Sequence, residues 1–395
     1  MSGHHALCID NLEAARHFLA ATGADPRGVG YMMPKAVFRC IKLKALPSHA
    51  ANIIKQEMLA KGGEAALSSA AVYGRGTTDV LLMGTLKQYR LLLDKLKLQP
   101  FGLSTVAEEI EMILQSLEKK PPPLELPSGK TLSFSRGVLV MGILNITPDS
   151  FSDGGRYLNP EQARQRALQM AAEGAHIIDI GGSSSRPGST PTEAGEEIGR
   201  VLPVIEKLAR EDLILSVDTW RSEVARLALE AGADLVNDIG RLQLDAGMIA
   251  VLAHHRAPVV LMHNRLQIQP GQPYQDLIPD MINELQESIA KGRAGGLSPQ
   301  QMIIDPGLGF GKTRDQNLHI IQQLTAFTGL GYPLLVGASR KSFIGSTLDL
   351  EVAERLEGSL AVAAAAVMKG AHIIRVHDVR ETIRVIRMLE AISGA

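Results

Sequence analysis

Short apolar runs alternate with amphipathic helical stretches along the last two thirds of the chain. Eight runs recur after residue 126, and their apolar character is continuous rather than alternating. Continuous apolar character is expected of parallel strands that are buried on both faces. The runs occupy residues 138–144, 176–180, 213–217, 235–236, 258–262, 302–304, 334–336 and 373–376.

The segments between these runs have helical periodicity, most clearly at residues 160–173, 221–231 and 354–369. Eight strand–helix units within about 250 residues predict an α/β fold of the (β/α)8 TIM-barrel type. A doubly wound open sheet is the alternative. No Gly-rich dinucleotide fingerprint follows the first run, which counts against that alternative.

The first third of the chain has a different organisation. Pro121-Pro122-Pro123 cannot continue a helix and favours an extended chain. Before these prolines, helical stretches alternate with short apolar runs, which predicts a smaller α+β domain without a chemical motif. We therefore predict an N-terminal domain over residues 1–120, a proline-rich linker over 121–129 and the barrel over 130–395. The expected helices are 11–21, 49–61, 85–98 and 105–120, and the expected strands are 36–41 and 80–83.

Composition narrows the class of protein. The formal net charge of the 395 residues is -1, so we expect no general attraction to nucleic acid or anionic membrane. The longest apolar run, residues 360–368, is far below the roughly 18 residues of a spanning helix. Cys8 and Cys40 form no disulfide framework, which fits a reducing compartment. We expect a cytoplasmic protein that binds small molecules.

Polar residues stand at nearly every predicted strand end, where a barrel of this type carries its chemistry. For Asp179 and Asp238 a second interpretation stays open, because a buried Asp can cap the following helix. The polar strand ends are Asn145, Asp179, Asp218, Asn237-Asp238, His263-Asn264, Asp305, Ser339-Arg340-Lys341-Ser342 and Arg375 with His377-Asp378.

Two subsets of these residues match two kinds of ligand. Carboxylates can pair with an amidine-like edge, so the first subset suits a flat, nitrogen-rich heterocycle. The second subset suits a phosphate or diphosphate, because Arg375 and His377 lie two apart on a strand and point the same way. The first comprises Asp218, Asn237, Asp305 and Lys341; the second comprises Asn145, Arg375 and His377.

Two loop sequences carry weaker signals. The run from Gly307 to Lys312 has the glycines and lysine of a phosphate loop without the Walker A spacing, so a tight turn is favoured. The serines at 183–185 precede Arg186-Pro187-Gly188 directly after a predicted strand, which favours a mobile substrate loop over a plain linker.

Several ordered motifs resemble those of the dihydropteroate synthase family. The segment at 141–155, Met-Gly-Ile-Leu-Asn-Ile-Thr-Pro-Asp-Ser-Phe-Ser-Asp-Gly-Gly, resembles the first family signature, and Asp179 to Gly188 resembles the second. The resemblance covers roughly residues 130–395. Further motifs follow in the family order at 216–219, 237–238, 305–307, 309–312, 339–342 and 375–378.

The resemblance implies that 6-hydroxymethyl-7,8-dihydropterin diphosphate and p-aminobenzoate react to dihydropteroate and pyrophosphate. It implies Mg2+ as the cofactor, held through Asn145, a homodimer, and sensitivity to sulfonamides. It assigns the pterin to the first subset above and the diphosphate to the second. It implies catalytic roles for Asp305, Lys341, Asp218 and Asp153, with Asp149 and Asp153 on a first mobile loop, and an aminobenzoate site bordered by Ser185, Arg186, Pro187, Phe310, Lys341 and Ser342.

Three departures from the family pattern are visible. Ser183 and Ser185 stand where the family has Glu and Thr, the segment after Asn264 lacks the usual Gln-Gly-x-Pro, and residues 1–120 lie outside the common catalytic domain. Two other classes remain as alternatives, a pterin-dependent methyltransferase and a non-catalytic pterin-binding protein. The Arg-Pro-Gly, Ser-Arg-Lys-Ser and Arg-Val-His-Asp motifs argue against the methyltransferase.

Overall fold

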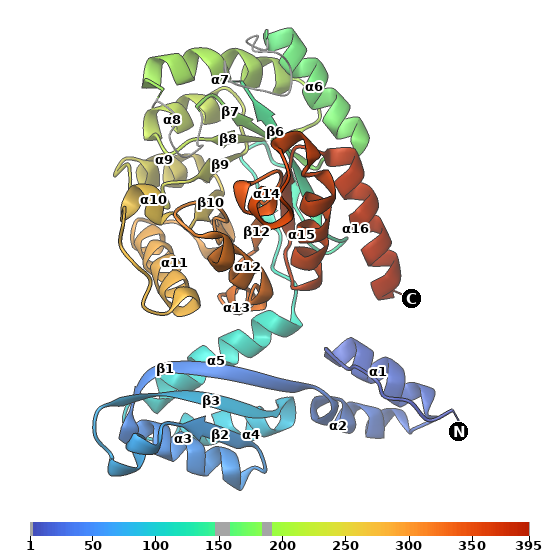
Figure 1. Cartoon of the computed structure of the whole chain (residues 1–395), viewed down its shortest axis with the longest axis vertical. Coiled ribbons are helices and arrows are strands. Elements are labelled where there is room, and N and C mark those ends of the chain that lie inside the picture. The colour runs from blue at the N-terminus through green and yellow to red at the C-terminus, as the bar shows by residue number, and fades with distance from the viewer. Residues whose placement is uncertain (1–2, 147–158, 184–191, 395) are drawn as a thin grey trace. The chain divides into compact units, whose positions relative to one another are not determined.

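The computed structural model describes residues 3–146, 159–183 and 192–394. The chain divides into two compact units, Met1–Lys119 and Lys120–Ala395 (Figure 1). Each unit has its own buried apolar core, so each is a separate folding body.

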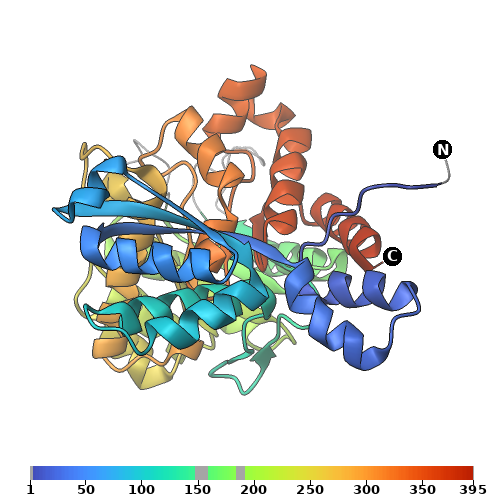
Figure 2. The same ribbon diagram turned by 90° about the horizontal axis from the view of Figure 1, so that it is seen from below.

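The first unit is a small α+β fold. Its elements are α1 (Leu12–Ala21), α2 (Pro26–Ala36), β1 (Phe38–Pro47), α3 (Ser48–Ala60), β2 (Glu64–Leu67), η1 (Ser69–Tyr73), β3 (Thr77–Thr85), α4 (Leu86–Leu96) and α5 (Leu103–Glu118). The strands form an antiparallel sheet in the order β1-β3-β2. Ile41, Leu43, Val80 and Leu82 alternate with exposed neighbours, and this buried face packs against α3, α4 and α5 (Figure 2).

The sequence patterns missed helix α2, strand β2 and the short turn η1 of this unit, and α2 is the largest of them. Its sequence contains Gly28, Gly30 and Pro34, which are poor formers of a helix interior. Asp25 nevertheless caps it by accepting from the backbone N–H groups of Arg27 and Gly28, and Pro26 stands at its first turn. Capping and packing of the buried Val29 and Pro34 therefore outweigh propensity.

The second unit is a barrel of eight parallel strands. They are β6 (Leu139–Asn145), β7 (Ile177–Gly181), β8 (Ile214–Asp218), β9 (Leu235–Asp238), β10 (Val259–Met262), β11 (Met302–Asp305), β12 (Leu335–Val336) and β13 (Ile373–Val376). Pairing runs from β11 through β10, β9, β8, β7, β6 and β13 to β12, and a bridge between Ile304 and Leu334 closes the last seam. The predicted fold class, a (β/α)8 barrel preceded by an α+β region, is confirmed.

Helices surround this ring of strands (Figure 1). On β7, Ile177 belongs to the barrel interior and Ile178 to the outer layer, which explains why the strand sequences read as continuously apolar. The helices are α6 (Pro160–Glu173), α7 (Ala194–Leu208), α8 (Ser222–Glu230), α9 (Met248–His255), α10 (Arg265–Ile268), α11 (Leu277–Ala294), α12 (Arg314–Gln322), α13 (Thr325–Thr328), α14 (Ser342–Leu348), α15 (Leu356–Met368) and α16 (Val379–Gly394), with short 3-10 turns η2 (Pro299–Gln301) and η3 (Val352–Glu354).

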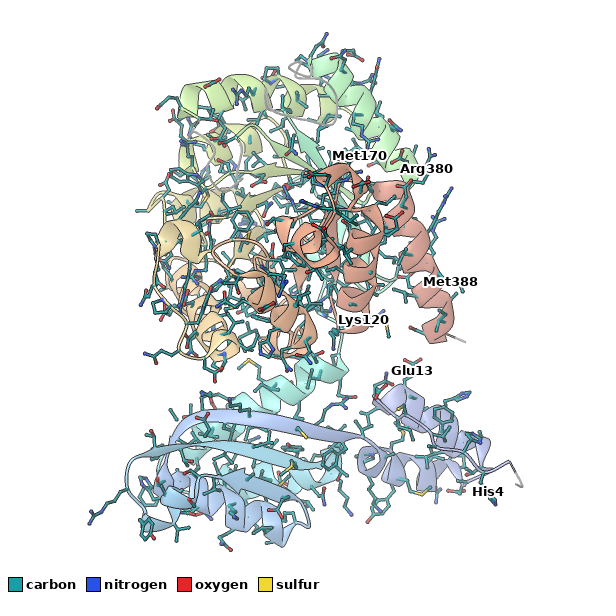
Figure 3. All side chains as sticks on the ribbon, in the orientation of Figure 1. His4, Glu13, Lys120, Met170, Arg380 and Met388 are labelled. Atoms are coloured by element: carbon teal, nitrogen blue, oxygen red, sulfur yellow. The ribbon has the colours of Figure 1, made fainter. Side chains whose placement is uncertain are left out.

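Helix α6 shows how the sequence of an outer helix sets its limits. The side chain of Asn159 caps its start in a capping box with Gln162, and Pro160 occupies its first position. Met170 on α6 is wholly buried, whereas Met388 on α16 is 62% exposed and points outward (Figure 3). Amphipathic helices such as α6 and α16 thus contribute one apolar stripe each to the layer around the strands.

A small hairpin closes the amino-terminal end of the barrel interior. Strands β4 (Leu124–Glu125) and β5 (Thr131–Leu132) pair in antiparallel fashion, within and next to the segment predicted as a linker. Leu124, Leu126, Leu132 and Phe134 are buried against side chains near the strand starts, namely Leu139, Met141, Ile177, Leu235, Val260, Ile303, Leu335 and Ile373. Apolar packing seals this end, so the polar strand ends gather at the other.

No helix within the described ranges is long and apolar enough to cross a bilayer.

Two truncated chains test the hairpin. A chain that begins at Lys120 keeps both hairpin strands, whereas one that begins at Lys130 loses β4 together with the buried Leu124 and Leu126. We expect the shorter chain to lose at least about 3 kcal/mol of unfolding free energy relative to the longer one, because two buried leucines leave the core. Urea unfolding followed by circular dichroism measures this, and equal unfolding free energies would contradict a sealing role.

Candidate functional site

The polar strand ends come together at the carboxyl ends of the parallel strands. Asp179, Asn237, Asp238 and Asp305 are each at most 4% exposed. Burial of so many polar groups costs free energy unless they are hydrogen-bonded or paired. The hydrogen bonds and ion pairs of these residues therefore determine the arrangement of the site.

Arg375, near the end of β13, is the centre of this pairing. Its Nε donates to Oδ2 of Asp179 at 2.6 Å, and its Nη2 donates to Oδ2 of Asp218 at 2.7 Å. Asn237 Nδ2 also donates to Asp179 Oδ2 at 3.0 Å. The guanidinium thereby joins β13 to β7 and β8, and Asn237 joins β9 to the same group through Asp179. Among the described residues the other oxygen of Asp179, Oδ1, has no partner.

Burial and charge set the protonation of this group. Burial raises the pKa of Asp218 to about 7, although Arg375 opposes the shift. Burial alone would lower the pKa of Arg375, but Asp179 and Asp218 outweigh it and raise this pKa. Arg375 is therefore a permanent cation, and Asp218 is the carboxyl that exchanges a proton near neutral pH.

Lys341 and Asp305 form the second charged part of the site. Burial raises the pKa of Asp305, with Lys341 acting against the shift, and burial lowers the pKa of Lys341 to about 8. Lys341 Nζ donates to the carbonyl oxygen of Leu308 and lies 4.8 Å from the centre of the Phe310 ring. Asp305 Oδ1 accepts from the N–H of Gly307 at 2.7 Å. Both side chains are thus held beside the loop that follows β11.

That loop is a tight turn rather than a nucleotide loop. Gly307, Gly309 and Gly311 have φ of 62°, 85° and 67°, a region that favours glycine. A Cβ on Gly307 would lie 2.0 Å from the carbonyl oxygen of His263, so only glycine fits. Lys312 Nζ donates to the carbonyl oxygens of Gly307, Phe310 and His263 at 2.8, 3.0 and 3.2 Å. Lys312 therefore stabilises the turn by hydrogen bonding to its backbone.

A buried ion network lies around His263, behind the end of β10. Glu284 on α11 accepts from Arg265 Nε at 2.8 Å and from Arg241 Nη1 at 3.0 Å. Burial lowers the pKa of His263 to about 3, so its imidazole is neutral. Burial would raise the pKa of Glu284, but bonds from His263 and Arg265 lower it to about 2. The network fixes the segment after Asn264 that departs from the family pattern.

The loops after β12 and β13 are tied to each other. Ser339 Oγ and His377 Nδ1 are 3.0 Å apart, and the backbone N–H of His377 also donates to Ser339 Oγ. Arg340 donates through Nε and Nη2 to the two carboxylate oxygens of Asp378 at 2.9 and 2.6 Å. His377 is therefore placed at the same end of the barrel as Arg375.

Asn145 lies beside the same group. A Cβ built on Gly181 would lie 3.6 Å from Asn145 Oδ1 and 3.8 Å from Asp218 Oδ2. Because Gly181 has no side chain, a small space remains near these two oxygen atoms. No cluster of three or more His, Cys, Asp or Glu suited to a metal is found among the described residues. An ion there would need oxygens from a ligand or water as well, which is usual for Mg2+.

An apolar patch borders the polar groups. Ile239, Met262 and Phe310 form a separate buried cluster, and the half-buried Trp220 packs against it. These residues end or follow β8, β9, β10 and β11, the strands that carry Asp218, Asn237 and Asp305. The site therefore combines a polar floor with an apolar wall, as expected of a pocket for a flat ring.

The structure brings together Asp218, Asn237, Asp305, Lys341 and Arg375, and places Asn145 and His377 at the same end of the barrel. Phe310 is 9% exposed in the patch, and Ser342 begins α14 at the surface. The two predicted subsets do not separate, because Arg375 bonds to Asp218. The remaining predicted site residues lie outside the described residues: Asp149, Asp153, Ser185, Arg186 and Pro187.

Sequence reasoning left some site residues without a role. Asp179 was noted at its strand end, yet its pairing with Arg375 joins positions 196 residues apart. Asp238 does not cap the next helix, α9, which begins at Met248. Its two oxygens instead accept from the N–H groups of Gly240 and Leu242 in the turn after β9, at 2.7 Å each. Trp220 was missed as a site residue. The sequence signal that could have indicated it is its position two residues after the strand-end Asp218.

The fold and the site define a class of protein. Residues 141–377 match the family of pterin binding enzymes, and the chain belongs to this family. Within it, the chain is 47% identical to the dihydropteroate synthase of Bacillus subtilis over 261 residues, which are 66% of this chain and 90% of that protein. The dihydropteroate synthase of Synechocystis is 46% identical over 278 residues, 69% of this chain and 96% of the relative.

One group of relatives also covers the first unit. A probable bifunctional folylpolyglutamate synthase/dihydropteroate synthase of Halobacterium salinarum is 39% identical over 387 residues. That match spans 97% of this chain but 46% of the relative, so the chain corresponds to about half of that protein.

Solved structures agree with the family. The Xanthomonas albilineans dihydropteroate synthase with 4-aminobenzoic acid superposes with a TM-score of 0.66 at 40% identity, over 70% of this chain and 100% of that chain. The same enzyme in complex with 7,8-dihydropteroate gives a TM-score of 0.63 at 38% identity, over 69% of this chain and 100% of that one.

Replacing Lys312 tests the support of the glycine turn. Lys312→Met keeps the apolar stem but removes the donor for three carbonyl oxygens. We expect the free energy of unfolding to fall by about 2–4 kcal/mol, because three carbonyl oxygens lose their hydrogen-bond donor. The control is Lys207→Met, whose ammonium meets Glu161 on the surface at 3.2 Å, with an expected change within about 0.5 kcal/mol. Equal losses in denaturant unfolding would contradict a special role for Lys312.

Proposed function

We propose that this chain is a transferase that joins 6-hydroxymethyl-7,8-dihydropterin diphosphate to p-aminobenzoate. The products are 7,8-dihydropteroate and pyrophosphate, on the route to folate. The observation that carries the proposal is the ring of buried polar strand ends around Arg375, beside an apolar wall. Family membership and the dihydropteroate synthase relatives agree with it.

The pterin lies on the polar floor in this proposal. Its ring carries N–H donors along one edge, and Asp218, Asn237 and Asp305 offer side-chain oxygens at the ends of β8, β9 and β11. Lys341 supplies a donor for the ring's acceptors. Buried acceptors that would otherwise stay unpaired reject ligands without matching donors, which makes this floor selective.

The diphosphate lies toward Asn145, Arg375 and His377. Arg375 already meets two carboxylates, so its charge is balanced before substrate arrives. Asn145 is the residue that would hold Mg2+, through its carboxamide oxygen. When bound, Mg2+ neutralises charge on the diphosphate oxygens and so makes pyrophosphate a better leaving group. An amide oxygen suits this hard cation, and oxygens of the diphosphate and of water would complete its coordination.

The reaction breaks one bond and forms another. The C–O bond to the diphosphate breaks, and the electron pair leaves with pyrophosphate. The remaining methylene carbon is electron-poor and is stabilised by the electron-rich pterin, with the Asp305 carboxyl as electrostatic partner. The amine of p-aminobenzoate attacks this carbon and then releases a proton to solvent. An aromatic amine is neutral at pH 7, so no strong general base is needed.

The aminobenzoate site lies toward Phe310, Lys341 and Ser342 in this proposal. Lys341 is held between Leu308 and the Phe310 ring, close to Asp305 in the same charged group. Sulfonamides share the aromatic amine of aminobenzoate, and a Yersinia pestis relative, 43% identical, has been solved with a sulfonamide drug. We therefore propose that sulfonamides inhibit this enzyme by competing with p-aminobenzoate.

The proposal also covers the cellular compartment and the oligomeric state. We assign the enzyme to the cytoplasm, in line with two free, exposed cysteines, Cys8 and Cys40. A homodimer formed through the outer helices of the barrel is the proposed assembly. Size-exclusion chromatography with light scattering tests the dimer, and a monomer at assay concentration would overturn it.

The decisive experiment is pyrophosphate release by the purified protein. The dihydropterin diphosphate is supplied with Mg2+, with and without p-aminobenzoate, and with EDTA in a third arm. Release that requires aminobenzoate and is matched by dihydropteroate establishes the reaction. Bound pterin without release would favour the methyltransferase or the non-catalytic class. Turnover unchanged by EDTA would remove Mg2+ from the proposal.

Asp305→Asn tests the electrostatic role of this carboxyl. The substitution keeps the size of the side chain, replaces one acceptor oxygen with an amide donor and removes the charge beside the electron-poor carbon. We expect kcat to fall at least about 100-fold with the fold intact, since charge stabilisation of a transition state is worth this much. Circular dichroism checks the fold, and Asp315→Asn, whose side chain is 77% exposed, is the control. Unchanged turnover would count against the role.

The affinity for the pterin should depend on the protonation of Asp218. Only the ionised carboxylate offers both oxygens as acceptors, and its pKa is raised to about 7 by burial. Protonation therefore weakens binding as pH falls, and the Kd of 6-hydroxymethyl-7,8-dihydropterin should rise roughly tenfold from pH 8 to pH 6. Calorimetry measures it. Asp218→Asn should bind weakly throughout with a smaller rise, and a flat profile for the unchanged protein would refute the assignment.

A further inference from the structure

Trp220 is the only tryptophan in the sequence, and it lies two residues beyond Asp218 after the end of β8. It is half-buried and packs on the cluster of Ile239, Met262 and Phe310. Those three residues follow or end β9, β10 and β11. The indole thus completes an apolar patch beside the polar floor, and no step of the proposed reaction uses it.

The indole is held in place by its neighbour. The Cζ atom of Arg221 lies 4.6 Å from the centre of the Trp220 ring. The same guanidinium pairs with Glu197 Oε2 at 2.5 Å and donates through Nη2 to the carbonyl oxygen of Thr192 at 2.7 Å. Glu197 is 1% exposed, so this anchor is buried. A cation fixed at two points on one side of a ring restricts the ring's orientation before any ligand arrives.

A pterin that bonds through its edge to Asp218, Asn237 and Asp305 still has two flat faces to remove from water. Aromatic rings pack favourably on such faces in offset or edge-to-face geometry. A tryptophan that served only as core filling would be expected deeper among aliphatic side chains. Trp220 instead stands at the strand ends, where the substrate ring must lie.

We propose that Trp220 is a specificity-determining residue of the pterin site, whose indole forms part of the wall against which the pterin ring packs. Arg221 is its positioning residue. The inference deepens the proposed function and rests on it. Unlike the polar floor, this wall recognises the aromatic surface of the ligand rather than its hydrogen-bonding edge.

The first test compares Trp220→Leu with Trp220→Phe. Leucine keeps apolar volume without a ring, whereas phenylalanine keeps a ring. We expect the Kd of 6-hydroxymethyl-7,8-dihydropterin, measured by calorimetry, to rise about threefold to tenfold with leucine and to recover largely with phenylalanine. The KM for p-aminobenzoate should stay within roughly twofold, which a general structural defect would not achieve.

The matched control is Tyr332→Leu. Tyr332 is also a half-buried aromatic residue, but it packs on the barrel core ahead of β12, at the amino-terminal end of the strands. Its replacement should leave the pterin Kd unchanged. An unchanged Kd in Trp220→Leu, an equal rise in Tyr332→Leu, or a shift confined to the KM for p-aminobenzoate would each overturn the inference.

Fluorescence gives an independent readout, because all tryptophan emission comes from one residue. The bimolecular quenching constant for acrylamide, taken from lifetimes, should fall at least roughly twofold when the pterin covers the ring. Trp220→Phe supplies the blank, and an unchanged constant at saturating pterin would overturn the inference. The unchanged enzyme is assayed first: absent dihydropteroate formation refutes the proposed function, whereas normal turnover with the outcomes above refutes only the role of Trp220.

Discussion

The sharing of Arg375 between Asp179 and Asp218 is the interaction on which the site depends. A buried guanidinium is tolerated only where carboxylates replace its water, and two buried carboxylates are tolerated only where a cation lies between them. The two ion pairs join β13 to β7 and β8, and Asn237 adds β9. A barrel mouth that would otherwise be a ring of unpaired charges thus becomes a preformed surface with defined donors and acceptors.

The same constraint explains the second layer of charged residues. Lys312 satisfies three carbonyl oxygens of a turn that glycines make possible, and Glu284 balances Arg241 and Arg265 behind the end of β10. Lys312 holds the backbone of Phe310 and of Gly307, and the N–H of Gly307 donates to Asp305. Electrostatic catalysis requires dipoles that do not reorganise during the reaction, and buried, hydrogen-bonded networks supply such rigidity.

Sequence patterns predicted the barrel because each strand is buried on both faces, and they predicted the strand-end residues because parallel strands end together. The patterns could not predict which side chains pair with one another. Nothing in the chain order pairs Asp179 with Arg375, and α2 forms against the propensities of its own glycines and proline. Trp220 was overlooked because its significance lies in residues from three other strands. The local sequence indicates where strands and helices form and which residues stand at the strand ends. The roles of these residues depend on contacts between segments that are distant in the sequence.

The barrel seam has a consequence for how the protein is made. Strand β6 pairs with β13, so Leu139 meets Ile373 across a separation of more than 200 residues, and the ring cannot close until β13 has been synthesised. Contacts of such long sequence separation form slowly. Until then the apolar hairpin around Phe134 and the open edge of β6 have no final partner. A nascent chain in this state is exposed to aggregation, so its yield in the cell should depend on chaperones more than its final stability implies.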